Sequence, residues 1–259
     1  MYLIFDTETT GLPKKWNAPL TDSDNWPRCV QLSWQIHDQE GALTSSRDYL
    51  IKPDGFKIPY DSENIHGIST ELAIQEGEGV NNVLNYFQDD LTKVDYIIGH
   101  NVKFDRNILG AEFLRKGKDD PFPAFKIIDT CTEETANVCQ IKGGPRGRFK
   151  LPTLTELYFF LFNDKFEEAH NATADVEATA RVFFELIRRK LIKPTAFDDQ
   201  NLQTDQIIKI QNTISLYGIK HKNLRLESQK LKSPSTDNRS PVLNQLDLLK
   251  GHPYVHLHN

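Results

Sequence analysis

The chain has few cysteines, no long apolar run and no excess of positive charge, and each of these absences excludes a class of protein. Only three of its 259 residues are cysteine, at irregular spacing, so neither a disulfide framework nor a zinc site is expected. The longest strongly apolar stretch, 157–162, is far too short to span a bilayer. The first apolar run has no basic region before it, so we expect no secretory signal. A reduced, cytoplasmic compartment and no membrane partner fit these features.

The charge balance excludes one class of nucleic-acid protein and leaves another open. The formal net charge is −5, whereas a protein that coats nucleic acid over its whole surface would be basic. An enzyme that holds a nucleic acid locally is not excluded, because acidic metal ligands themselves add negative charge. With 38% hydrophobic and 26% charged residues, the composition is typical of a globular protein. The length suits one sizeable α/β domain with additional material.

The apolar pattern predicts three strands, followed by alternating helices and strands. Strands are expected at 2–6, 29–37 and 44–52, where short connections favour antiparallel neighbours. Two short strands, at 96–99 and 127–128, and two helices, one with apolar residues from Val80 to Phe87 and one over 106–116, are expected to follow. This order is typical of a mixed sheet with helices on its faces.

The second half of the chain is expected to be helical up to Pro194. Capping-box patterns at Thr130-x-x-Glu133 and Thr153-x-x-Glu156 predict two helix starts. The last long helix is expected over 173–191, with one apolar stripe, and Pro194 ends it. We therefore expect a folded domain over 1–192 and a C-terminal extension over 193–259. The extension would hold one more helix over 207–217 and a polar segment over 218–241, within which 233–241 is expected to be a flexible linker.

Asp6 and Glu8, at the end of the first apolar run, are the most informative pair in the sequence. Residues two apart on a strand point to the same face. Two carboxylates on one face repel each other unless a cation lies between them. Mg²⁺ and Mn²⁺ prefer oxygen ligands of this kind. An isolated Asp-x-Glu is more often a solvated strand end, so a metal site here requires further ligands.

Two later segments supply those ligands. Asp105 follows the predicted strand 96–99 and lies at the start of a helix, and His170 and Asp175 lie where the last long helix begins. Strand ends and helix N-termini can converge on one cleft, and helix N-termini favour anions. Four carboxylates and one histidine suit a two-metal phosphodiester hydrolase. The histidine would remove a proton from water, since its unperturbed pKa is about 6.5.

The segments that carry these residues resemble, in order, the three motifs of the DEDDh 3′→5′ exonucleases: Phe5-Asp-Thr-Glu-Thr-Thr-Gly-Leu12, Gly99-His-Asn-x-x-Phe-Asp105 and His170-x-x-x-x-Asp175. This family is typified by the epsilon proofreading subunit of bacterial DNA polymerase III, and the resemblance covers about residues 1–190. It implies a ribonuclease H-like fold, with a mixed five-stranded sheet, and two divalent cations, Mg²⁺ or Mn²⁺. It also implies 3′→5′ release of 5′-mononucleotides from single-stranded or frayed DNA, as in replication proofreading.

The resemblance assigns roles to single residues. Asp6, Glu8 and Asp175 would hold the metal nearest the attacking water. Asp6 would bridge to the second metal, with Asp105 near it through water, and His170 would be the general base. The residues expected beside the terminal nucleotide or around its pocket are Thr7, Thr9, Thr10, Gly11, Leu12, His66, Asn101 and Phe104. A loop cap or a core hydrogen bond is an equal alternative for His66 and Asn101, as is ordinary packing for Leu12.

The segment 140–150 carries four basic residues and no acidic ones, among glycines and a proline that predict a loop. It either binds the phosphate backbone of a nucleic acid or is a solvated surface loop. The leucines of the following segment, 151–157, are expected in the core.

Two short segments of the extension resemble parts of the replication machinery. Gln245-Leu-Asp-Leu-Leu249 resembles the peptide with which bacterial replication proteins bind the sliding clamp. Leu246, Leu248 and Leu249 would enter an apolar pocket and Gln245 would bond at its edge, with an affinity that depends on tethering. A single amphipathic helix turn is the alternative.

The segment 254–259 resembles the first motif of PHP domains, which opens the alpha subunit of DNA polymerase III. This subunit, in the same chain or in another, is then the expected partner, and the chain would be the front part of a longer polypeptide. His256 and His258 would be metal ligands of the domain that begins there. A tag remnant or a chance His-x-His is the alternative.

Two other functions compete with DNA proofreading. An RNA exonuclease of the same family would use the same site and contact the 2′-OH of its substrate. A non-catalytic module that docks a polymerase on a clamp belongs to a different class. All five catalytic positions hold the expected residue types, which argues against the docking module.

Overall fold

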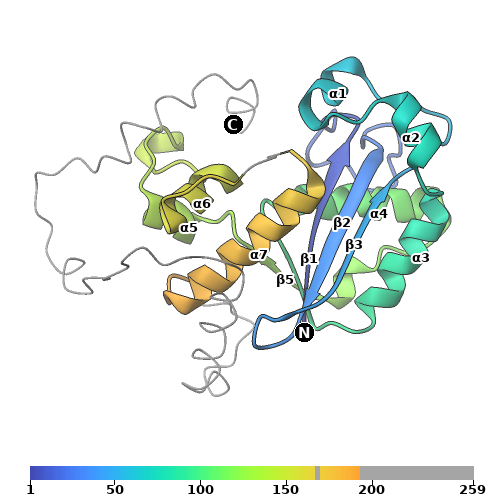
Figure 1. Cartoon of the computed structure of the whole chain (residues 1–259). Helices are drawn as coiled ribbons and strands as arrows, with labels where there is room; N and C mark the ends of the chain where they lie inside the picture. The colour runs from blue at the N-terminus through green and yellow to red at the C-terminus, as the bar shows by residue number, and fades with distance from the viewer. Residues whose placement is uncertain (167–169, 193–259) are drawn as a thin grey trace, which may run out of the picture.

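The computed structural model describes residues 1–166 and 170–192. A five-stranded sheet lies at its centre, with helices on both faces (Figure 1). The strands are β1 (Tyr2–Thr9), β2 (Cys29–His37), β3 (Leu43–Leu50), β4 (Tyr96–Gly99) and β5 (Lys126–Asp129). Their order across the sheet is β3-β2-β1-β4-β5. The predicted ribonuclease H-like α/β fold is confirmed.

The sheet is mixed, and β1 is its central strand. β1 pairs antiparallel with β2, and β2 pairs antiparallel with β3. β1 and β4, and then β4 and β5, pair in parallel. The strands at 29–37 and 96–99 have the predicted bounds. β1 continues to Thr9, beyond the predicted end at residue 6, so both Asp6 and Glu8 lie within the strand.

The described residues form seven helices: α1 (Tyr60–His66), α2 (Thr70–Glu76), α3 (Val80–Leu91), α4 (Lys103–Arg115), α5 (Glu133–Cys139), α6 (Leu154–Phe162) and α7 (Ala172–Arg188). Single 3-10 turns occur at Phe122–Ala124 and Pro145–Gly147. α1 and α2 were not predicted. Each is seven residues long and buries one small side chain, Ser62 or Ala73, so neither has an apolar stripe in the sequence.

The first predicted capping box is wrong by two residues. Thr132, not Thr130, caps α5: its Oγ1 accepts the N–H of Thr135 at 3.4 Å, and Thr135 Oγ1 accepts the N–H of Thr132 at 3.0 Å. Thr130 is fully buried and donates its N–H to the carbonyl of Gly99 at 3.0 Å. This bond continues the pairing of β4 with β5, which holds Thr130 away from the helix. The predicted capping box of Thr153 and Glu156 is confirmed.

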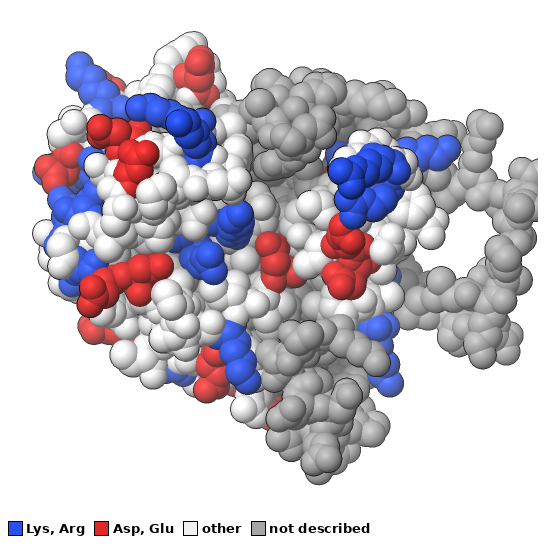
Figure 2. Space-filling view, turned by 180° about the vertical axis from the view of Figure 1, so that it is seen from behind, with Lys and Arg blue, Asp and Glu red and all other residues white. Residues whose placement is uncertain are grey.

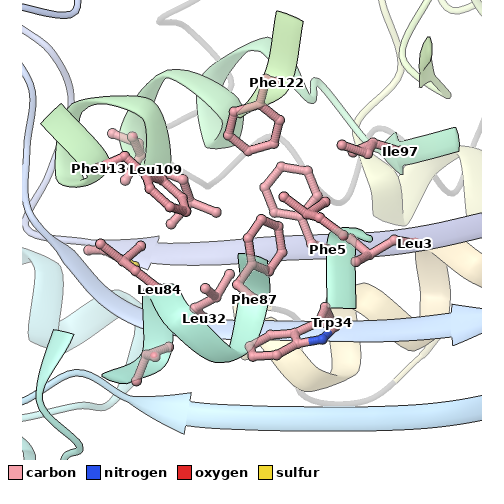
Figure 3. Close-up of a cluster of buried hydrophobic side chains, with 14 of the residues drawn as sticks. Leu3, Phe5, Leu32, Trp34, Leu84, Phe87, Ile97, Leu109, Phe113 and Phe122 are labelled. Carbon is pink, nitrogen blue, oxygen red and sulfur yellow. The ribbon is translucent and has the colours of Figure 1, made fainter. Parts of the chain in front are cut away.

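The alternation of side chains along β1 sorts the core into two layers. Leu3 and Phe5 face α3 and α4, where they pack among Phe87 and Phe122 (Figure 3). Tyr2 and Ile4 face the opposite way, onto α7, and pack against a cluster that includes Phe183. Because the period is two, the α7 side also receives Asp6 and Glu8.

The features predicted beyond residue 192 lie outside the described residues: the helix over 207–217, the polar segment over 218–241 with its linker at 233–241, the peptide 245–249 and the segment 254–259. The boundary between the domain and the extension therefore stays a prediction. α7 ends at Arg188, three residues before the predicted helix end. Among the described residues, no helix combines the length and the apolar character needed to cross a membrane.

Candidate active site

Three carboxylates meet where β1 approaches its C-terminal end. Asp6 and Glu8 come from β1, and Asp175 comes from the first turn of α7. One carboxylate oxygen from each lies within 4.8 Å of those of the other two. The packing of α7 over β1 creates this meeting, because the buried stripe that follows Asp175, beginning at Val176, lies in the same cluster as Ile4. The carboxylates thus continue, toward solvent, the row of side chains that forms this core.

Asp105 approaches the same strand from the other face of the sheet. It lies in the first turn of α4, and only 4% of it is exposed. Its Oδ1 accepts the hydroxyl of Thr7 at 2.6 Å and the Thr7 N–H at 3.1 Å. Both bonds end on Oδ1, so these donors leave Oδ2 available to a cation. Thr7 was expected beside the nucleotide, but its buried side chain holds Asp105, and a substrate contact for it stays a prediction.

All four carboxyl groups have raised pKa values. Burial is the main cause, and it lifts the pKa of Asp6 well above its ordinary value and that of Glu8 to about 9, with further contributions from the neighbouring carboxylates. Burial also raises the pKa of Asp105 to about 7, against the hydrogen bonds from Thr7, and that of Asp175 to about 7. A divalent cation among these oxygens would offset both burial and repulsion. The donor set therefore fits a hard cation such as Mg²⁺ or Mn²⁺.

His170 lies at the turn that leads into α7. The residue is exposed and has a left-handed backbone with φ of 73°. Its N–H donates to Asp175 Oδ2 at 3.0 Å. The next residue, Asn171, caps α7 by accepting the N–H of Thr173 at 3.0 Å. The turn thus joins the histidine backbone directly to one carboxylate of the cluster and leaves the residue in contact with solvent.

The predicted nucleotide-binding segment after Glu8 turns sharply. Thr9 is buried, and its Oγ1 donates to the carbonyl of Gly11 at 2.7 Å. Gly11 has a φ of 134°, a backbone conformation that residues other than glycine rarely adopt. Thr10 Oγ1 accepts the N–H of Arg28 at 2.9 Å, which ties the turn to the start of β2. Leu12 emerges from this turn with 37% of its surface exposed, where a substrate can touch it.

His66, at the end of α1, lies near the same turn. Its Nδ1 accepts the N–H of Ile68 at 3.1 Å, which is the loop-cap role considered for it. Its Nε2 is buried without a hydrogen bond within the described residues. Burial lowers the pKa of this ring. The backbone of Thr9 is close enough to oppose that shift, although its geometry falls short of a hydrogen bond.

The sequence analysis missed one residue that supports the predicted site: Asp129, at the end of β5. Its carboxylate accepts the N–H groups of Asn101 at 2.8 Å, Val102 at 3.1 Å and Cys131 at 2.8 Å. Asn101 has a positive φ of 58°, so this carboxylate fixes the turn that leads into α4 and carries Asp105. An acid directly after an apolar strand was the available signal, as it was for Asp6.

The basic segment 140–150 is only partly available for binding. Arg148 pairs with Glu133, and Lys150 pairs with Glu156 at 2.7 Å, so two of its four cations already have acidic partners. On the face drawn in Figure 2, which is the back of the view in Figure 1, Lys and Arg side chains are interleaved with Asp and Glu side chains. The described residues form no continuous basic surface on this face. The expectation that the following leucines are core fails for Leu151, which is 49% exposed, because it precedes α6.

Comparison with known proteins agrees with this geometry. The RNase T family model, described as exonuclease, matches residues 3–183, a range that contains all five predicted catalytic positions. Ribonuclease T of Marinobacter nauticus is 30% identical over 203 residues, which cover 72% of this chain and 82% of that protein. The PolC-type DNA polymerase III of Pediococcus pentosaceus is 27% identical over 186 residues, or 71% of this chain. The chain spans only 11% of that polymerase.

Solved structures show the same fold. The zinc-bound complex of E. coli exonuclease I with single-stranded DNA aligns with a TM-score of 0.56 at 22% identity. The alignment covers 73% of this chain and 40% of that one. Because the family model matches residues 3–183, which include the carboxylate cluster, the chain belongs to the RNase T exonuclease family.

Proposed function

We propose that the chain is a metal-dependent 3′→5′ exonuclease that releases 5′-mononucleotides from single-stranded or frayed DNA. The observation that carries the proposal is the cluster of Asp6, Glu8 and Asp175, whose carboxylate oxygens lie within 4.8 Å of one another. Asp105 adds a fourth carboxylate, itself buried, from the opposite face of the sheet. Membership of the exonuclease family supports hydrolysis of a phosphodiester bond at this cluster.

Two divalent cations, Mg²⁺ or Mn²⁺, suit this set of ligands. Asp6, Glu8 and Asp175 would hold one, and Asp6 together with Asp105 would hold the other. When bound, the cations supply electrostatic stabilisation of the charge that develops on the phosphate oxygens. Thr7 would keep the Asp105 carboxylate in one orientation, because both of its donors hold the same oxygen.

His170 would act as the general base that takes a proton from the attacking water. Histidine can accept a proton near neutral pH. The residue is exposed, so its proton can pass on to solvent. The hydrogen bond from its backbone to Asp175 keeps the turn at the edge of the carboxylate cluster.

DNA proofreading is the favoured context because of the similarity to PolC-type DNA polymerase III. The chain would then work with a polymerase alpha subunit, in the same polypeptide or as a partner, in the cytoplasm. RNA is the second candidate substrate, supported by the 30% identity to Ribonuclease T. The clamp peptide 245–249 lies outside the described residues and stays a prediction.

A degradation assay with a 5′-labelled oligonucleotide tests the proposal. Single-stranded DNA and RNA of one sequence, and primers with matched or mismatched 3′ ends, are incubated with Mg²⁺, Mn²⁺ or EDTA. We expect single-nucleotide shortening from the 3′ end only with a divalent cation, faster on DNA than on RNA and faster on mismatched primers.

Asp175→Asn and His170→Ala should each lower the rate by at least about a hundredfold, the usual scale for a lost catalytic group. Asp119→Asn, which changes an exposed carboxylate outside the site, should leave the rate unchanged. A wild-type chain that degrades neither substrate with either metal would refute the proposal. If RNA were degraded faster than DNA, RNA would be the preferred substrate.

A further inference from the structure

Trp16 is an exposed aromatic residue outside all three sequence motifs, and it contacts the helix that carries Asp105. It lies in the loop between β1 and β2, and 38% of it is exposed. Its ring centroid is 5.9 Å from that of Phe104, at an interplanar angle of 52°. Phe104 directly precedes Asp105 in α4. The indole therefore contacts Phe104, and the next residue in the chain is the predicted metal ligand Asp105.

The loop presents this indole on a fixed backbone. Asn25, 5% exposed, accepts the N–H of Lys15 at 2.7 Å on its side-chain oxygen and donates to the Lys15 carbonyl at 3.0 Å. The Asn25 carbonyl also accepts the N–H of Lys14 at 3.1 Å. These bonds hold the residues immediately before Trp16. A rigid aromatic group loses little conformational entropy when a ligand binds to it.

The same loop is aligned along α4, which determines where Trp16 lies. Arg115, at the end of α4, donates to the carbonyls of Ser23 at 2.7 Å and Trp26 at 2.6 Å. In the middle of α4, the Leu20 side chain lies very close to Gly110. A Cβ added to this glycine would be only 2.8 Å from Leu20 Cδ1. The contact of Trp16 with Phe104 is the third point of alignment. It places the indole at the end of the helix that carries Asp105.

Trp26 shows what this loop does with an indole used for packing. It is only 3% exposed, and its Nε1 donates to the carbonyl of Pro19 at 3.1 Å. Trp16 in the same loop keeps more than a third of its surface exposed, which simple coverage of Phe104 does not require.

The residues around Trp16 have the chemistry of a single-strand binding surface. Lys14 and Lys15 precede it and are exposed, and Lys103, beside Phe104, is exposed as well. Proteins that hold single-stranded nucleic acid combine such cations, which meet the phosphates, with aromatic rings on which bases stack. This combination is local, which is compatible with a net charge of −5.

We propose that Trp16 stacks on one base of a single-stranded substrate near the 3′ end, while Lys14 and Lys15 contact its backbone. The inference rests on the proposed nuclease function and adds a binding residue to it. Stacking that involves the base face alone tolerates any base sequence, as a proofreader requires.

The test compares Trp16→Leu with Trp16→Phe. Leucine still covers Phe104 but has no aromatic face, whereas phenylalanine keeps one. On single-stranded DNA the leucine variant should raise KM about tenfold, within the range expected for one lost base stack, with kcat changed less than about twofold. The phenylalanine variant should stay within about threefold of wild type. Equal melting temperatures would verify that both variants fold.

Oligonucleotides with one abasic site at each of the last four positions complete the test. At the position that Trp16 contacts, wild type and Trp16→Leu should have the same KM. An unchanged KM on ordinary DNA, or an equal loss at every abasic position, would overturn the stacking role, provided that the wild-type chain degrades DNA. If the wild-type chain has no nuclease activity, the proposed function itself fails, and the two failures remain distinct.

Discussion

Thr7 lies between two predicted metal ligands and yet serves a third. The side chains of Asp6 and Glu8 point toward α7, so the intervening Thr7 points the opposite way, toward α4. Its hydroxyl and its N–H both hold Asp105 Oδ1. One strand thus orients carboxylates on both sides of the sheet, and a hydroxyl becomes part of the site by holding a carboxylate in place.

Thr7→Val should therefore weaken catalysis more than substrate binding. Valine keeps the shape of threonine and the backbone bond to Asp105, but it removes the 2.6 Å bond from the hydroxyl. A hydrogen bond to a charged group contributes about 1.5–3 kcal/mol, so kcat should fall by at least about tenfold. The Mg²⁺ concentration for half-maximal rate should rise, while KM for DNA stays unchanged. Thr44→Val, on the exposed edge strand, is the matched control.

His100 gives the fold a defined acid sensitivity. Its ring contacts Thr130 Oγ1 at 2.9 Å and the Pro152 carbonyl at 3.0 Å, and burial lowers its pKa to about 4. The unfolded chain takes up a proton near pH 6.5, which the folded chain accepts only near pH 4. The free energy of unfolding should therefore fall as the pH drops through this window, by on the order of 3 kcal/mol.

His100→Gln isolates this effect. Urea unfolding at pH 7, 5.5 and 4.5 should show a smaller loss of stability in the variant than in wild type across this range. Glutamine does not titrate, so the pH dependence that remains in the variant comes from the carboxyl groups and from the other histidines with lowered pKa values, His37 and His66. Parallel curves for the two proteins would show that His100 is protonated equally in both states.

At the scale of the elements, the strand ends and the helix starts hold one another in place. Asp129 at the end of β5 accepts three backbone N–H groups from the turns that lead into α4 and α5. Asp175 in the first turn of α7 accepts one from the turn before that helix. Carboxylates thus satisfy N–H groups that loops and helix starts would otherwise leave unpaired.

Asp129→Ala should destabilise the domain by about 2–4 kcal/mol, because it leaves up to three partly buried N–H groups without an acceptor. Asp129→Asn keeps one acceptor oxygen and should lose less. Guanidinium unfolding of both variants, with Asp119→Asn as an exposed control, provides the measurement. Equal stabilities for the alanine variant and wild type would mean that water replaces the carboxylate at no cost.

The elements with a strong apolar pattern could be predicted, and those without one could not. β2 and β4 have their predicted bounds because the full run of each strand is apolar or half-apolar. α1 and α2 could not be predicted, since each packs through a single small residue. The helix cap lies at Thr132 and not at Thr130 because Thr130 extends the pairing of β4 with β5. A capping pattern in the local sequence does not reveal that pairing.

At the scale of the whole molecule, the site opposes stability. Burial raises the pKa of all four carboxyl groups, and the neighbouring carboxylates add to this shift at Asp6 and Glu8. Such a cost is characteristic of functional sites, where activity and stability conflict. Cation binding should reduce this cost in stability, and removing one of the carboxyl groups should reduce it as well.

Glu8→Gln should accordingly melt at a higher temperature than wild type in EDTA, while losing nuclease activity. A gain of ~1 kcal/mol would raise the midpoint by roughly 2–4 °C in a domain of this size. Mn²⁺ should raise the midpoint of wild type and have a smaller effect on the variant. Scanning fluorimetry with and without EDTA measures both, with Glu71→Gln as an exposed control. A lower midpoint for Glu8→Gln in EDTA would contradict the repulsion.

The placement of the predicted site depends on contacts across the whole molecule. Asp6 and Glu8 could be paired from the strand period alone, but their approach to Asp175 requires α7 to pack on the same face of the sheet. Trp16 and Asp129 carried no motif. Their positions follow from the loop aligned on α4 and from the pairing of β4 with β5, which appear only in three dimensions.

The central position of β1 divides the site into two parts with different freedom to move. Asp6 and Glu8 lie on a strand paired with β2 on one side, and with β4 on the other along its first half. Their backbone therefore moves only when the sheet opens, which requires most of the free energy of unfolding. His170 and Asp175 lie at a helix terminus, where opening costs little. Fraying of this single turn would therefore separate Asp175 from Asp6 and Glu8 while the sheet stays paired.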